Sequence, residues 1–153
     1  MENKVTFTSL KTLYLAINFM QLIFIVVICY LVQDSYIVSW DFSNPFCIIS
    51  LLSCILAVSL QFFVFRKMIY QIENKIFEEK LKTYQNAFIF RLGILEFSTL
   101  LCCVFGLITS NIAYLFFALP TLFLSVSLYP SKYKIIEDTK LSADERKRFY
   151  KEY

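Results

Sequence analysis

The residues best able to do chemistry in this sequence are a few polar side chains inside long apolar runs. Glu96 ends the segment Arg91-Leu-Gly-Ile-Leu-Glu96, and Gln21 takes the matching place in Leu15-Ala-Ile-Asn-Phe-Met-Gln21. An ionisable group at the centre of a bilayer costs about 2.5–3.5 kcal/mol on insertion scales, so such a glutamate requires a partner or a function. A protonated glutamate both donates and accepts hydrogen bonds. We therefore expect Glu96 to point into the protein interior and to bond Gln21.

Three further polar residues occur at shallower positions in the apolar runs. Arg91 lies about 6 Å into its run by the rise of a helix, and Gln61 lies at a similar depth in another run. Asn18 falls between the levels of Arg91 and Glu96. Since Arg91 and Glu96 are about 140° apart around a helix, they point in different directions. We predict that Arg91 reaches toward the membrane surface or meets Gln61 and Asn18.

The runs that carry these residues have the length and composition of transmembrane helices. Of the 153 residues, 58% are apolar and 18% are charged, against about 45–50% and about 25% in soluble domains. The runs cover residues 12–32, 46–65, 87–108 and 112–129, and a helix needs about 20 apolar residues to cross a bilayer. The sequence therefore predicts a single all-α transmembrane domain over 1–153, a four-helix bundle made of two antiparallel hairpins.

The basic residues predict how this bundle is oriented. Lys and Arg occur at the N-terminus (Lys4 and Lys11), between the second and third runs, and in the tail, whereas the other two connections have none. Because Lys and Arg concentrate in cytoplasmic loops, we predict a multi-pass protein of the cell (inner) membrane with both termini in the cytoplasm. Tyr36 and Trp40 in the first connection are expected to anchor it at the membrane interface.

Two segments outside the runs have helical patterns, and one run has a predicted hinge. Residues 66–86 are expected to form an amphipathic cytoplasmic helix that continues the second span or lies on the membrane surface. In the cytoplasmic tail, residues 130–153, Ser142 and Glu145 form a capping-box pattern that starts a short basic helix. That helix would touch anionic lipid or remain solvated. Pro120 should kink the fourth span as a hinge.

The composition also argues against several kinds of catalytic and metal site. The chain has five cysteines, no C-x-x-C pair and no histidine, so a metal site or a general base is not expected. It has no glycine-rich phosphate loop and no nucleophile motif. We predict that it is not an enzyme, uses no cofactor, and binds no nucleic acid.

Part of the sequence resembles a known kind of protein. The segments Arg91-Leu-Gly-Ile-Leu-Glu96, Leu107-Ile-Thr-Ser-Asn-Ile112 and Tyr129-Pro-Ser-Lys-Tyr-Lys-Ile-Ile-Glu-Asp138 are similar to an uncharacterised family of small four-span bacterial integral membrane proteins. The resemblance covers roughly the C-terminal half of the chain. It implies the four-span topology and brings no assigned activity.

Two functional hypotheses follow. In the first, the chain is a non-enzymatic structural or accessory subunit that packs with itself or with a larger membrane complex, and the cluster of polar residues joins helices. In the alternative, the bundle conducts protons or ions, with Glu96 titrating at the membrane midplane. The partners expected from either hypothesis are the lipid bilayer, further copies of the chain, and other membrane proteins.

Overall fold

The computed structural model describes residues 7–33, 37–73 and 75–152; Lys4 and Tyr36 therefore lie outside the described residues. The described residues form helices joined by short connections and contain no β-strand, which confirms the all-α class. The helices are α1 (Phe7–Val32), α2 (Pro45–Tyr70), α3 (Phe77–Thr109), α4 (Ala113–Ser127), α5 (Lys132–Asp138) and α6 (Ala143–Glu152).

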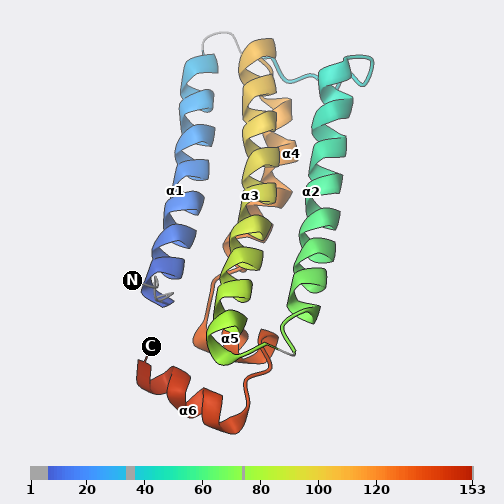
Figure 1. Cartoon of the computed structure of the whole chain (residues 1–153). Helices are drawn as coiled ribbons and strands as arrows, with labels where there is room; N and C mark the ends of the chain where they lie inside the picture. The colour runs from blue at the N-terminus through green and yellow to red at the C-terminus, as the bar shows by residue number, and fades with distance from the viewer. Residues whose placement is uncertain (1–6, 34–36, 74, 153) are drawn as a thin grey trace.

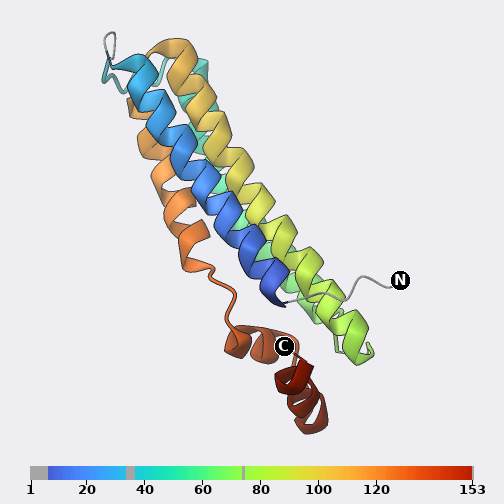
Figure 2. The same cartoon turned by 90° about the vertical axis from the view of Figure 1, so that its left-hand side faces the viewer.

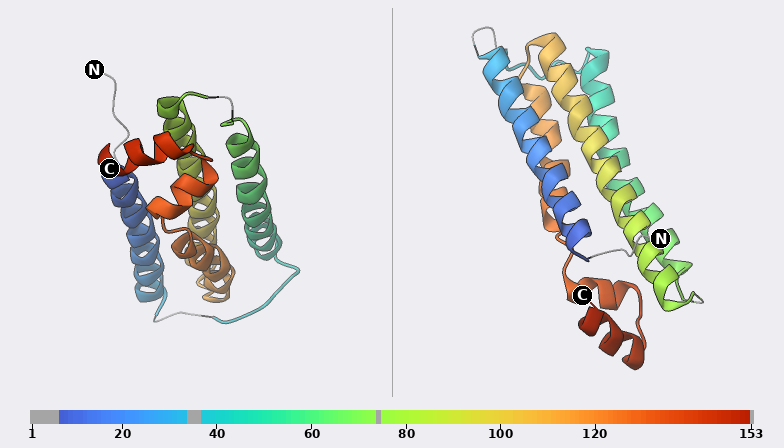
Figure 3. Two further views of the ribbon diagram at one scale, coloured as in Figure 1. Left: turned by 90° about the horizontal axis from the view of Figure 1, so that it is seen from below. Right: turned by 60° about the vertical axis from the view of Figure 1, so that its left-hand side comes forward.

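Helix α3 is the central element of the molecule. It packs against α1, α2 and α4, and α1 and α2 lie on opposite sides of the α3–α4 pair (Figure 1 and Figure 3). Helix α4 runs antiparallel to α3, as the tight turn between them requires (Figure 2). The beginning of α1, the connection between α2 and α3, and the short helices α5 and α6 all lie at one end of the bundle.

Three of the helices are long and apolar enough to cross a membrane. Helices α1 and α2 have 26 residues each and α3 has 33, which at about 1.5 Å per residue exceeds the hydrocarbon core of about 30 Å. Helix α4 has 15 residues and is about 22 Å long by the same rise. It is followed after a short break by α5, which is bent away by 89°. The described residues therefore hold three candidate spans, or four if α4 and α5 belong to one.

The ends of the long helices follow from local sequence. Pro45 is the first residue of α2, and Asn44 caps that helix by accepting a hydrogen bond from the backbone N–H of Phe46 at 3.0 Å. Helix α3 ends at Thr109 and is followed by the C-cap residue Ser110, whose φ of 51° is left-handed. The N–H of Asn111 then bonds the carbonyl of Gly106 at 3.0 Å, which closes the helix end.

Asn111 also joins the two connections at the far end of the bundle. Its Oδ1 accepts from the N–H of Ala113 at 3.0 Å and of Ser39 at 3.3 Å, and its Nδ2 donates to the carbonyl of Ser39 at 2.9 Å. The backbone of Ile37 bonds the same turn, donating to Ser110 at 2.9 Å and accepting from Ile112 at 3.0 Å. The segment that follows α1 is thereby held to the α3–α4 turn.

The prediction of one amphipathic helix over 66–86 is wrong. Residues 66–70 complete α2, the chain turns at 71–73, and residues 77–86 begin α3. The apolar stripe exists for another reason, because Ile72, Phe77 and Leu81 are buried against α5 and α6. A periodic apolar face signals burial but does not say whether lipid or protein covers it.

The C-terminal helices dock on this end of the bundle. The predicted capping box is present, since the Glu145 carboxylate accepts from the N–H of Ser142 at 2.8 Å and the Ser142 hydroxyl accepts from the N–H of Glu145 at 3.4 Å. Lys80 of α3 bonds both oxygens of Glu145, at 3.0 and 3.1 Å. Phe149 of α6 is buried in the apolar cluster that also contains Phe77 and Leu81. The tail helix is therefore docked on the bundle rather than frayed, and its contact with anionic lipid stays a prediction.

Candidate functional site

Arg91 is the best-connected of the predicted polar residues in the spans. Its Nε donates a hydrogen bond to Oε1 of Gln61, which joins α3 to α2. The guanidinium carbon lies 4.6 Å from the centre of the Phe65 ring and 5.4 Å from that of Phe62, in reach of cation–π attraction. The predicted contact between Arg91 and Gln61 is confirmed.

The charge of Arg91 also reaches the docked C-terminal segment. Burial raises the pKa of the Asp138 carboxyl in α5, and the positive charge of Arg91 partly offsets this by lowering it. Arg91 thus interacts with a neighbouring span through Gln61 and with the C-terminal helices through Asp138.

Asn18 does not join this group. Its Nδ2 donates to the carbonyl of Tyr14, one turn earlier in its own helix, at 2.9 Å. Its Oδ1 is buried without a hydrogen-bond partner. The predicted contact between Arg91 and Asn18 is therefore wrong, because Asn18 is bonded to its own helix while Arg91 faces α2.

The predicted bond between Gln21 and Glu96 is also absent. Gln21 is fully buried, and neither polar atom of its amide has a hydrogen-bond partner. Ile28 and Cys103 lie in one apolar cluster, and Gln21 and Glu96 come seven residues before them in two helices that run the same way. The two side chains therefore lie at a similar level, as predicted, but no hydrogen bond joins them.

Glu96 lies at the edge of the buried face of α3. Leu95 and Thr99 beside it are fully buried, whereas Gly93 and Phe97 are exposed. The carboxyl is half-buried, and the described residues offer it no hydrogen bond or ion pair. Glu96 thus lies where the packed interior meets the outer surface of the bundle, rather than inside the bundle.

A second group of contacts surrounds Pro120, which lies inside α4. A proline has no N–H for the carbonyl one turn earlier, that of Phe116. The next two carbonyls receive side-chain donors: Cys54 Sγ donates to Phe117 at 3.0 Å, and Thr121 Oγ1 donates to Ala118 at 2.8 Å. Helix α4 continues unbroken through this point, and the role of Pro120 as a hinge stays a prediction.

Sequence reasoning missed several side chains that join the helices. Thr99 of α3 and Thr121 of α4 have hydroxyl oxygens 3.0 Å apart, and Ser53 of α2 and Ser98 of α3 have theirs 3.3 Å apart. The hydroxyl of Tyr14 in α1 donates to the carbonyl of Val126 in α4 at 2.5 Å. These contacts connect α3 with α4, α2 with α3, and α1 with α4 through uncharged groups.

The sequence of α2 carries a signal for close helix packing. Its buried positions are separated by alternating steps of three and four residues and hold only small or polar side chains: Cys47, Ser50, Cys54, Ala57 and Gln61. Small residues at such spacing let helices approach closely in membranes, and hydroxyls among them bond across the interface. A search for glycines alone does not detect this pattern, because its small positions hold Cys, Ser and Ala.

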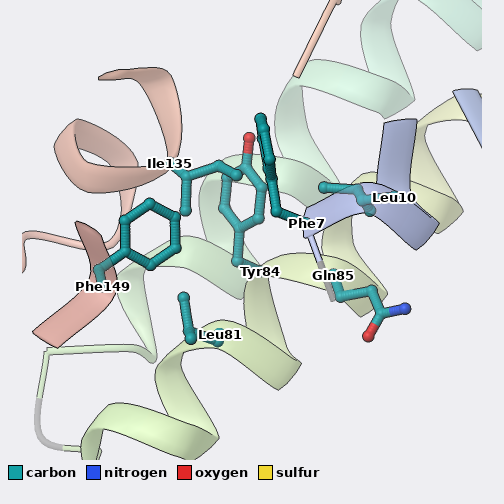
Figure 4. Close-up of a pocket in the computed structure, with 7 residues that line it drawn as sticks. All are labelled: Phe7, Leu10, Leu81, Tyr84, Gln85, Ile135 and Phe149. Carbon is teal, nitrogen blue, oxygen red and sulfur yellow. The ribbon is translucent and has the colours of Figure 1, made fainter. Parts of the chain in front are cut away.

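A small pocket lies where α1, α3, α5 and α6 meet (Figure 4). Its lining is mostly apolar and aromatic, and the amide of Gln85 points away from the rings. The lining residues are Phe7, Leu10, Leu81, Tyr84, Gln85, Ile135 and Phe149. Among the described residues no group of three or more Cys, Asp or Glu side chains is arranged to hold a metal.

Comparison with known proteins adds no assignment. No protein-family model matches the sequence, and neither a curated protein nor a solved structure matches it. The functional argument therefore depends on the chain's own geometry.

Proposed function

We propose that the chain is a non-enzymatic, four-span integral membrane protein that acts as a structural or accessory subunit, packing with itself or with a larger membrane complex. The observation that carries the proposal is that polar residues in the spans bond from one helix to another. The bond from Arg91 to Gln61 and the contact between Thr99 and Thr121 each join two helices. Such groups contribute to helix association in membranes.

The fourth span of this proposal combines α4 with the segment after it. That segment, 128–131, continues toward the basic end of the bundle (Figure 2), and Leu128 and Pro130 in it are buried. Carbonyls near the end of α4 receive donors from outside the helix, since Tyr14 bonds Val126 at 2.5 Å and Lys134 Nζ bonds Ser127 at 3.3 Å. Backbone carbonyls that lack a helical partner at membrane depth require hydrogen-bond donors of this kind.

We place both termini in the cytoplasm of a cell (inner) membrane. The support is that basic residues of α2, α3, α5 and α6 gather at the end where the described chain begins and ends. Exposed aromatic rings mark both ends, with Trp40 and Phe42 at one and Tyr70 and Tyr133 at the other, as in the aromatic belts of membrane proteins.

The alternative of a proton or ion path has one observation in its favour. Asn18 Oδ1, both amide atoms of Gln21 and Ser125 Oγ are buried without hydrogen-bond partners. Buried polar atoms are normally satisfied by protein or by water. Asn18 and Gln21 lie in α1 between two contacts with α4, those of Tyr14 with Val126 and of Ile28 with Leu115.

Two measurements separate these functions. Liposomes containing the purified protein and a pH-sensitive dye should show no proton flux above protein-free liposomes, and gentle-detergent purification with mass spectrometry should recover the chain with itself or with membrane proteins. A proton flux that the substitution Glu96→Gln abolishes, while the fold is retained, would instead support the conducting function.

A further inference from the structure

We infer that the outer face of α3 around Glu96 and Gly93 is a contact surface for a second copy of this chain, in which the two Glu96 carboxyls hydrogen-bond each other. This inference rests on the self-packing form of the proposed function. It starts from Glu96, a carboxyl near the middle of α3 to which the described residues offer no hydrogen bond or ion pair. Glu96 lies at the edge of the packed face, where an unpartnered carboxyl in a membrane is costly.

The part of the chain that the structure describes offers no complementary group for this carboxyl. Arg91, the basic residue nearest to it along α3, is committed to Gln61 and to the Phe65 ring. Gln21 lies at a similar level but is fully buried, with its amide unbonded. Among the described residues the donor for Glu96 therefore has to come from another molecule.

A second copy supplies a fitting group through symmetry. In a hydrocarbon environment a carboxyl is neutral, because burying an isolated charge there costs far more than protonating it. A neutral carboxyl has one donor and free acceptor sites. Two such groups related by a two-fold axis each donate to the other, and two-fold contacts between identical surfaces are the most common way in which protein chains associate.

The backbone beside Glu96 has the shape that a close contact needs. Gly93 is one turn before Glu96, and a Cβ added there would meet no atom within 4 Å. Packing within the chain would thus allow a larger side chain at this position, which holds one of only two glycines in the sequence. A glycine on the outer face lets another helix approach closely. Phe90 and Phe97, which are 51% and 68% exposed, lie on either side of it along the helix.

The experiment measures dimerisation of the full chain in liposomes by fluorescence energy transfer between labelled copies. The wild-type chain is expected to dimerise, and Glu96→Gln should retain the dimer because an amide also donates and accepts. Glu96→Leu should raise the Kd about tenfold, which corresponds to the loss of one or two interhelical hydrogen bonds. Gln21→Leu tests the contact within one chain and should leave the Kd unchanged.

Gly93→Leu separates contact from folding. Replacing a glycine in a helix by leucine favours the helix, and Gly93 has open space beside it. The temperature at which the monomer unfolds should therefore not fall. The dimer should nevertheless weaken. A Kd that is unchanged in both Glu96→Leu and Gly93→Leu would overturn the inference.

Cross-linking locates the surface. In a Cys29→Ser background, Phe97→Cys is expected to form a disulfide-linked dimer on oxidation, whereas Phe123→Cys on the exposed side of α4 should not. Cross-linking through Phe123→Cys alone would overturn the inference while leaving self-association intact. A monomeric wild-type chain that co-purifies with other membrane proteins would overturn it and leave the proposed function standing. A monomer without partners would contradict both.

Discussion

At the scale of single residues, the polar side chains inside the long helices differ in what they bond. Arg91 and Gln61 meet as predicted, because their depths agree and α2 and α3 are neighbours. Gln21 and Glu96 also share a level, yet they do not bond. Depth follows from counting residues along a helix, whereas direction depends on helix rotation, which a helix that is apolar on all sides does not encode.

The bond between Arg91 and Gln61 predicts a specific loss of stability. Gln61→Leu removes the acceptor of a partly buried guanidinium, and leaving such a group unsatisfied costs about 1–3 kcal/mol. Chemical unfolding in detergent micelles should show this decrease in the free energy of unfolding. Ser59→Leu, at an exposed position of the same helix, is the matched control and should change it by no more than about 0.5 kcal/mol. Equal losses in the two variants would show that the bond is not stabilising.

At the scale of elements, hydropathy located the long helices, and the short polar turn between α3 and α4 fixed their antiparallel arrangement. The boundaries were less predictable where helices leave the apolar runs. Helix α3 begins at Phe77, about ten residues before its apolar run, because its first turns pack against α5 and α6 rather than against lipid. This tertiary contact leaves no local signal beyond an apolar stripe.

The packing of α2 on α3 predicts a cross-link. Cys54 Sγ and Cys102 Sγ are 3.6 Å apart, and a disulfide needs about 2.05 Å. Oxidation by iodine, which takes two electrons as the two thiols lose their protons, should join them. Peptide mapping should find the pair in the wild-type chain and in Cys103→Ser but not in Cys102→Ser. A bridge from Cys54 to Cys103 would contradict this packing of α2 on α3.

The docking of α6 predicts a dependence on pH. Hydrogen bonds from the Ser142 backbone and from Lys80 lower the pKa of Glu145 despite its desolvation, below the usual value of about 4.3. Glu145 therefore stabilises the docked state above that value, and this contribution is lost as the pH falls through the lowered pKa.

Hydrogen exchange over residues 143–151, corrected for intrinsic rates, should report increased opening of α6 under acid conditions. Glu145→Gln should open more readily at neutral pH and respond less to acid. If acid opened wild-type and Glu145→Gln chains to the same degree, another group would be responsible.

At the scale of the whole molecule, the helices of the bundle are held together from inside. Polar contacts, the stripe of small residues on α2 and the docked C-terminal helices all contribute to this packing. Its outer surface is apolar along the long helices, with Phe19, Phe63 and Phe97 all more than 60% exposed. Charged residues gather at the end formed by α5, α6 and the connection between α2 and α3. This distribution is what a bilayer requires.

The most direct test of the four-span proposal is the side of the membrane on which each connection lies. A membrane-impermeant maleimide applied to intact cells should label Ser43→Cys above the background of the wild-type chain. Lys82→Cys and Lys147→Cys, both at exposed positions of the basic end, should be labelled only after permeabilisation. Labelling of Lys82→Cys and Lys147→Cys from opposite sides of the membrane would contradict the four-span topology.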